Sequence, residues 1–240
     1  AKQKANGSES DDTICTADLT DDEILEGLNL LFIGDSIAVD VTDDFYEIFP
    51  NSVSDTKIGR ITSLGKQVLD SYIDEKKWEG EGVIFASLSN SPINGELEDI
   101  REKIGKDMPL FLTTVRIPHD TFEDESNSKI KKFVEENDHT YLIDWYAASE
   151  GHDEYFDADD THLLSAGAKA YAKCIKEAVL DAYKKENIEI PKSRLSSGTD
   201  TSKDSGNDSS TDTSTDSSND SSTDPSMDSS NDSSADTSTE

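Results

Sequence analysis

The sequence predicts an α/β fold, namely a three-layer α/β/α sandwich around a central, parallel, five-stranded sheet. Short apolar runs bounded by turn residues are typical of strands that are buried on both faces. Segments with apolar residues at helical spacing lie between these runs. The two patterns alternate five times along the chain. This alternation favours a parallel sheet that has helices on both faces and right-handed crossovers.

Each predicted strand is a short apolar run. The first begins at Leu30 and ends before Gly34. The second begins at Ser52, alternates apolar and polar residues, and is the weakest of the set. In chain order, the predicted strands are residues 30–33, 52–58, 82–88, 109–115 and 140–143. Ligands of parallel sheets bind beyond the carboxyl ends of the strands, so the residues that follow each strand are candidates for chemistry.

Apolar stripes predict the helices. The members of a stripe recur at three or four residues, which places them on one face of a helix. The last helix shows the clearest stripe. The stripes comprise Leu64, Val68, Tyr72 and Ile73, followed by Trp78; then Ile130, Phe133 and Val134; and then Ala168, Tyr171, Ala172, Ile175 and Val179.

Composition divides the chain into three parts. Residues 1–22 are polar and predict an N-terminal arm or linker, and residues 23–195 predict one domain. In residues 196–240 an aspartate recurs at every fourth position, with no Val, Ile, Leu or aromatic residue, which predicts a disordered acidic spacer. Weak multivalent binding of calcium or of cationic surfaces is the alternative for this tail. We expect the chain to be a piece of a longer protein.

The charge balance excludes one class of partner. The chain has 53 acidic and 22 basic side chains, for a formal net charge of −31. A nucleic-acid-binding protein needs a cationic face that displaces counterions from phosphates, so nucleic acid is not an expected partner. No apolar run approaches the roughly 20 residues that span a bilayer.

The segment Gly34-Asp35-Ser36 follows the first predicted strand. Gly34 permits a tight turn, after which Ser36 lies near the first turn of a helix. Backbone N–H groups and the helix dipole stabilise an oxyanion at such a position, so Ser36 is a candidate nucleophile. The alternative is that Ser36 is only the N-cap of that helix.

Asp159 and His162 precede the last predicted helix. Residues three apart in a helical turn face the same way, so the carboxylate can orient the imidazole as a general base. A metal site is the alternative, because Asp157 and Asp160 lie beside them. The chain has neither a His-Glu-x-x-His nor a Cys-x-x-Cys motif, so a catalytic metal is not expected. No organic cofactor is expected either.

Polar residues also follow other strands. Gly59 and Arg60 follow the second strand, and Asn90 follows the third. A glycine N–H and an asparagine side-chain N–H are donor types that an oxyanion hole requires, although Asn90 could also serve as a turn residue. Arg60 and Arg116 are candidates for substrate binding. Arg116 could instead anchor a loop carboxylate.

These blocks resemble those of the SGNH (GDSL) hydrolase superfamily, through Gly34-Asp35-Ser36, Asn90 and the Asp159/His162 pair. A closer resemblance is to the C-terminal extracytoplasmic domain of Gram-positive peptidoglycan O-acetyltransferases. It covers about residues 27–182. The sequence departs from the superfamily pattern at Leu88, two residues before Asn90, where the superfamily usually has Gly. The closer resemblance is carried by Lys57-Ile58-Gly59-Arg60, Thr114-Val115-Arg116-Ile117-Pro118, Asp144-Trp145-Tyr146-Ala147-Ala148-Ser149 and Gly151-His152-Asp153-Glu154-Tyr155-Phe156.

The resemblance implies an SGNH or flavodoxin-like fold and a site. Ser36 is the implied nucleophile, His162 the general base and Asp159 its orienting partner. The implied oxyanion hole consists of the backbone N–H groups of Ser36 and Gly59 and the side chain of Asn90. The implied reaction moves an acetyl group, through acetyl-Ser36, to the C6 hydroxyl of N-acetylmuramic acid in peptidoglycan.

The resemblance also implies partners and a location. The implied partners are peptidoglycan glycan strands and a membrane acyltransferase region of the parent protein, which delivers the acetyl group. The implied location is the extracytoplasmic face of the cell membrane or the cell wall. Two other functions stay open. One is a secreted SGNH carbohydrate O-acetyl esterase, and the other is a non-catalytic surface binding or display domain, which would be expected to lack a triad member.

Cys15 and Cys174 are the only cysteines. One precedes the predicted domain and the other lies on its last helix, so a disulfide would clamp the N-terminal arm to the domain. Two free thiols are the alternative. The extracellular location that the resemblance implies would support the disulfide.

Overall fold

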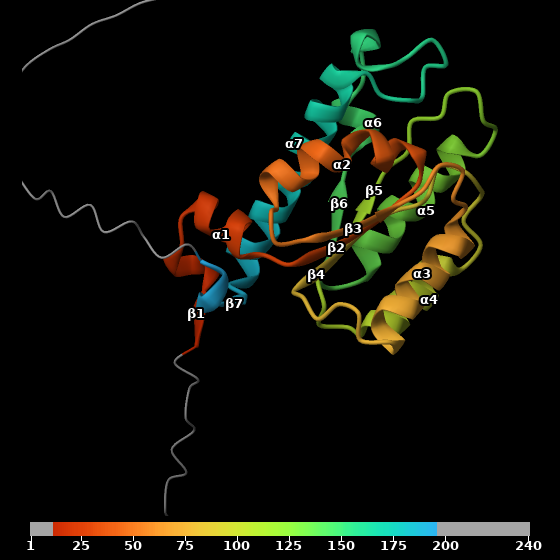
Figure 1. Ribbon diagram of the computed structural model, residues 1–240. Helices are drawn as coiled ribbons and strands as arrows, with labels where there is room; N and C mark the ends of the chain where they lie inside the picture. Colours follow the sequence, from red (N-terminus) through yellow and green to blue (C-terminus); the bar gives the residue numbers. More distant parts are fainter. Residues whose placement is uncertain (1–11, 196–240) are drawn as a thin grey trace, which may run out of the picture. The chain divides into compact units, whose positions relative to one another are not determined.

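A five-stranded parallel sheet forms the centre of the fold (Figure 1). The computed structural model describes residues 12–195, so the predicted acidic tail and the first half of the predicted arm lie outside the described residues. Neighbouring strands of the sheet are all parallel, in the order β3-β2-β4-β5-β6. The predicted α/β fold is therefore confirmed. The strands are β2 (Leu30–Gly34), β3 (Val53–Thr56), β4 (Gly82–Ala86), β5 (Leu110–Thr113) and β6 (Thr140–Ile143).

Helices cover both faces of this sheet. Successive side chains of a strand point to opposite faces, so Phe32 packs in one apolar cluster while Leu31 and Ile33 pack in another. Every residue of β2 is buried, which explains its unbroken apolar run. The first cluster includes α1 (Asp21–Gly27), α2 (Ser36–Ile48) and α7 (Ser165–Glu186), and the second includes α3 (Thr62–Asp74), α4 (Glu96–Ile104) and α5 (Glu123–Glu136).

Secondary structure begins before residue 23, within the predicted N-terminal arm, and the domain boundary itself stays a prediction. β1 (Thr13–Cys15) pairs antiparallel with β7 (Glu189–Pro191), next to a short 3₁₀ helix η3 (Lys192–Arg194). A second 3₁₀ helix, η1 (Thr16–Asp18), leads from β1 toward α1. A strand of three residues is too short to show a periodic pattern. It forms because its partner comes from the other end of the domain.

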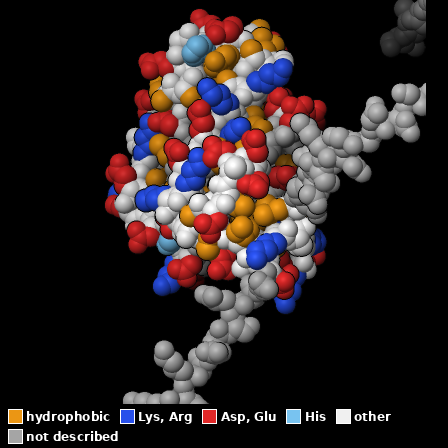
Figure 2. Space-filling view, turned by 90° about the vertical axis from the view of Figure 1, so that its left-hand side faces the viewer, with side chains coloured by type: hydrophobic (Ala, Val, Ile, Leu, Met, Phe, Trp, Pro, Cys, Tyr) orange, Lys and Arg blue, Asp and Glu red, His pale blue; other side chains and the backbone are white. Residues whose placement is uncertain are grey.

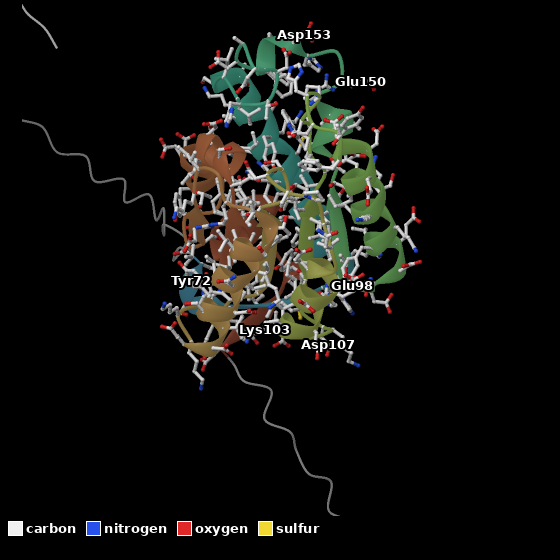
Figure 3. The ribbon with its side chains drawn as sticks, turned by 90° about the vertical axis from the view of Figure 1, so that its right-hand side faces the viewer. Tyr72, Glu98, Lys103, Asp107, Glu150 and Asp153 are labelled. Atoms are coloured by element: carbon white, nitrogen blue, oxygen red, sulfur yellow. The ribbon has the colours of Figure 1, made fainter. Side chains whose placement is uncertain are left out.

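The loops that follow the strands gather at one end of the sheet. Figure 3 shows Glu150 and Asp153, which follow β6, at the upper end, and Lys103 and Asp107, which precede β5, at the lower end. The short helices α6 (Trp145–Ala148) and η2 (Asp153–Tyr155) belong to the upper end. This carboxyl end of the sheet is where parallel α/β folds bind ligands.

Charged side chains are spread over the surface. On the face that carries α1 and β7, Figure 2 shows Asp and Glu side chains with Lys and Arg among them. Within residues 12–195, no helix has both the length and the apolar character that crossing a membrane requires.

Candidate active site

Ser36 is the first residue of α2, two positions after the end of β2. The N-cap of this helix is Asp35, whose Oδ1 accepts the backbone N–H of Ile37 at 3.1 Å. The interpretation of Ser36 as a mere N-cap is therefore wrong, since Asp35 has that role. Gly34 is required at the turn, because a side chain there would collide with Ala38. The Ser36 hydroxyl thus lies at the positive end of the α2 dipole.

Three predicted side chains form one hydrogen-bonded chain. The Nε2 atom of His162 lies 2.9 Å from Oγ of Ser36, and its Nδ1 atom lies 2.5 Å from Oδ2 of Asp159. The other oxygen of Asp159 accepts the backbone N–H groups of Thr161 and His162 at 3.0 and 2.9 Å. Helix α7 packs beside α2, so the loop before α7 reaches Ser36. The arrangement suits proton transfer from a serine hydroxyl to a histidine that a carboxylate orients.

The pKa values of His162 and Asp159 are shifted in the directions that suit a general base and the carboxylate that orients it. The hydrogen bond to Asp159 raises the pKa of His162 above its ordinary value of 6.5. The hydrogen bonds from His162 lower the pKa of Asp159 to about 2. Because its pKa is lowered, Asp159 stays ionised at neutral pH and increases the basicity of the imidazole. The side chains of His162 and Asp159 are 44% and 50% exposed, so solvent weakens the electrostatic interaction between them.

A buried carboxylate connects the turn before Ser36 to the loop after β4. Asp35 is 0% exposed, and its Oδ2 accepts both the N–H and the hydroxyl of Ser89, at 3.0 and 2.5 Å. Burial raises the pKa of Asp35, while the hydrogen bonds from Ser89 and Ile37 act in the opposite direction. The sequence did not predict this pair. Only the adjacency of β2 and β4 in the sheet brings the two residues together.

Two of the three predicted oxyanion donors, Gly59 and Asn90, follow β3 and β4, the strands that flank β2 in the sheet. Gly59 adopts a φ of +71° in the turn after β3, a conformation that favours glycine. The side-chain N–H of Asn90 donates to Oγ of Ser89 at 3.3 Å, which ties Asn90 to the Asp35 network. The roles of both residues as oxyanion donors stay predictions.

Arg60 is held among the ends of the strands, and its role in substrate binding stays a prediction. Its side chain is only 6% exposed. Nη1 donates to the carbonyl oxygens of Gly34 at 3.1 Å and Asp55 at 2.5 Å, and Nη2 lies 2.5 Å from the carboxylate of Asp55. The guanidinium therefore joins the ends of β2 and β3. Nη1 and Nη2 are therefore engaged inside the protein, where they stabilise the ends of these two strands.

Arg116 lies at the edge of the same region. Its guanidinium carbon lies 5.7 Å from the ring centroid of Tyr146 and 5.5 Å from that of Phe156. These are cation–π contacts, in place of the loop carboxylate that the sequence offered as an alternative. Arg116 also lines a small cavity together with Asp35 and Tyr171. Substrate binding by Arg116 stays a prediction.

The acidic residues around His162 have separate partners. The Asp157 carboxylate accepts the backbone N–H of Ala158 at 2.7 Å, and Asp160 pairs with Nε2 of His119 at 3.1 Å. Within residues 12–195, no group of three or more His, Cys, Asp or Glu side chains is arranged to hold a metal ion. These carboxylates therefore hold the loop in place.

Cys15 and Cys174 are free thiols, so the disulfide considered from the sequence is not formed. Cys15 lies opposite Glu189, beyond the C-terminal end of α7, whereas Cys174 lies twelve residues before the last residue of that helix. Twelve residues of helix correspond to about 18 Å. A disulfide joins Cα atoms only about 4.4 to 6.8 Å apart.

The fold and this arrangement of residues define a class: the chain has the SGNH hydrolase fold. Its sequence is similar to the O-acetyltransferase OatA of Staphylococcus aureus, with 33% identity over 146 residues, or 60% of this chain and 24% of that protein. The chain therefore spans about a quarter of the length of the curated relatives it matches. The resemblance found in the sequence is confirmed. No model of a protein family matches the chain.

Two solved structures share the fold. The first is the C-terminal catalytic domain of peptidoglycan O-acetyltransferase A from Streptococcus pneumoniae, solved with a methylsulfonyl adduct. It aligns with a TM-score of 0.60 and 19% identity, over 69% of this chain and 99% of that chain. The second is a family 3 carbohydrate esterase from Clostridium thermocellum, with a TM-score of 0.52 and 11% identity, over 67% and 99% of the two chains.

Proposed function

We propose that this protein is a serine-dependent O-acetyltransferase that moves an acetyl group to the C6 hydroxyl of N-acetylmuramic acid in peptidoglycan. The observation that carries the proposal is the hydrogen-bonded chain from Ser36 through His162 to Asp159. The similarity to OatA supports acetyl transfer over other acyl chemistry. The catalytic domain is residues 23–195 together with the β1 segment that packs on it.

The reaction begins when His162 Nε2 takes the proton of the Ser36 hydroxyl. Oγ then bonds to the carbonyl carbon of the acetyl donor. The resulting oxyanion accepts hydrogen bonds from the backbone N–H groups of Ser36 and Gly59 and from the side chain of Asn90. The bond between the acetyl carbon and the donor oxygen breaks, and that oxygen takes the proton from His162. Acetyl-Ser36 remains.

The second half transfers the acetyl group to the glycan. The C6 hydroxyl loses its proton to His162 and attacks the acetyl carbon. The bond to Oγ breaks, and the proton on His162 returns to Ser36. Peptidoglycan strands are the acceptor, and a membrane acyltransferase region of the parent protein is the source of acetyl groups. The domain acts on the extracytoplasmic side of the membrane or in the cell wall, where its acceptor lies.

Hydrolysis is the second candidate. The side chains of His162 and Asp159 are about half exposed, so water can reach the acyl-enzyme. A carbohydrate esterase shares the fold. With water in place of the sugar hydroxyl, the same site releases acetate. The two functions differ only in which acceptor reaches acetyl-Ser36 first.

The test uses p-nitrophenyl acetate as donor, with and without a chitooligosaccharide acceptor. We expect an acetyl adduct on Ser36 by mass spectrometry after rapid acid quenching, and acetylated sugar when the acceptor is present. Ser36→Ala should lose the adduct and the turnover, whereas Ser128→Ala, at an exposed position of α5, should retain both. Free acetate without acetylated sugar would contradict the transferase and leave the esterase.

A further inference from the structure

A carboxylate on the nucleophile's helix holds the segment that carries His162. Asp40 lies four residues after Ser36 in α2, so the two side chains project from the same face of that helix. The Oδ2 atom of Asp40 accepts the backbone N–H of Leu163 at 3.0 Å. Leu163 directly follows His162 in the chain. The bond therefore fastens α2 to the residue beside the candidate base.

The other backbone contacts around His162 lie within its own segment. The carbonyl of His162 accepts the N–H of Asp157 at 2.8 Å, and the N–H of Leu164 donates to the carbonyl of Tyr155 at 2.9 Å. Phe156 forms a bridge with Leu163. These bonds shape the loop from within, but they do not set its distance from α2. The contact of Asp40 with Leu163 helps to set this distance, together with the packing of α7 beside α2 and the hydrogen bond between Ser36 and His162.

We propose that Asp40 is a positioning residue that holds His162 within hydrogen-bond reach of Ser36. Catalysis by acyl transfer requires this reach before the proton can move, and a displacement of about 1 Å can cost a large factor in rate. In Asp40→Ala the loop keeps its internal bonds and the hydrogen bond between His162 and Ser36, but Leu163 loses its bond to α2. This part of the inference rests on the proposed function, whereas the attachment itself does not.

Asp40 also contributes charge at this site. Three carboxylates raise the pKa of His162, with Asp159 the largest contributor and Asp40 and Asp35 smaller ones. His119, in the segment after β5, pairs with Asp160 of the same loop as His162. A negative charge on α2 favours the imidazolium that forms when His162 takes the Ser36 proton. Asp40→Asn separates the two effects, because an amide oxygen still accepts the Leu163 N–H but carries no charge.

Three variants test the proposal: Asp40→Ala, Asp40→Asn and the control Asp43→Asn, which removes a charge from an exposed position of the same helix. Amide hydrogen exchange at Leu163 reports the attachment, and NMR titration of the His162 ring protons reports its pKa. Both measurements are independent of turnover. The pH dependence of p-nitrophenyl acetate hydrolysis reports catalysis.

We expect Asp40→Ala to accelerate exchange at Leu163 and to reduce kcat about tenfold, with little change in KM. Asp40→Asn should keep Leu163 protected, keep most of kcat at high pH and lower the pKa of His162, which moves the acidic limb of the pH profile to lower pH. Asp43→Asn should match the wild type. Unchanged exchange at Leu163 in Asp40→Ala, or a wild-type His162 titration in both Asp40 variants, would overturn the proposal even in a protein without ester turnover.

Discussion

The buried carboxylate of Asp35 holds Ser89 through two hydrogen bonds, one from its backbone N–H and one from its hydroxyl. Asp35 also caps the helix that begins with Ser36, so a single side chain fixes the turn at Ser36 and the loop that carries Asn90. Leu88, at the position where the superfamily usually has Gly, is fully buried in the apolar cluster on the α3 side of the sheet. The loop therefore stays anchored despite this departure.

The predicted role of Asn90 in stabilising the oxyanion can be tested separately from the roles of the neighbouring loop residues. If its side-chain N–H stabilises the oxyanion, Asn90→Ala should reduce kcat for p-nitrophenyl acetate about 100-fold, the usual effect of losing one such donor. Asn94→Ala is the matched control, because Asn94 is exposed on the same loop. Equal rates in the two variants would assign Asn90 to the turn alone.

The raised pKa of His162 predicts where activity is lost at low pH. Only the neutral imidazole can accept the Ser36 proton, so kcat/KM should fall as the pH drops through a value above 6.5. Asp159→Asn removes the hydrogen bond that causes the shift. We expect the acidic limb to move to lower pH and the plateau to fall by about 100-fold or more. A wild-type limb below pH 6.5 would contradict this electrostatic arrangement.

Arg60 should matter for stability. Arg60→Ala removes the cation beside the Asp55 carboxylate and one of the two donors to the Gly34 carbonyl, which keeps the backbone N–H of Lys57, and it should lower the free energy of unfolding by about 2 kcal/mol. Lys57→Ala, an exposed cation in the same turn, should change it by less than about 0.5 kcal/mol. Urea unfolding at equilibrium measures both. Equal unfolding midpoints for the two variants would show that the Arg60 contacts are not stabilising.

Both cysteines should be alkylated without prior reduction, because neither is in a disulfide. Iodoacetamide added to the denatured protein should add two labels, as measured by intact mass. In the folded protein Cys174 should react slowly, since burial raises the pKa of its thiol. Labels that appear only after addition of a reductant would contradict the free thiols.

The sequence by itself determined the central sheet, because strands buried on both faces leave unbroken apolar runs. The predicted run at residues 30–33 corresponds to β2, and residues 140–143 match β6. Helix α4 was not predicted, since its nine residues carry only a few apolar positions among charges. The sequence also predicted the three hydrogen-bonded residues Ser36, His162 and Asp159. Their motifs are local patterns that directly follow a strand or precede a helix.

Only the tertiary structure decided the contacts that join distant segments. It pairs β1 with β7, places Arg60 between two strand ends, and ties Asp40 to Leu163. It also separates the two cysteines by the C-terminal part of α7. None of these contacts has a local period or a fixed spacing. Each depends on which strands are neighbours and which helices pack together, and such neighbours are set by the burial of the whole core.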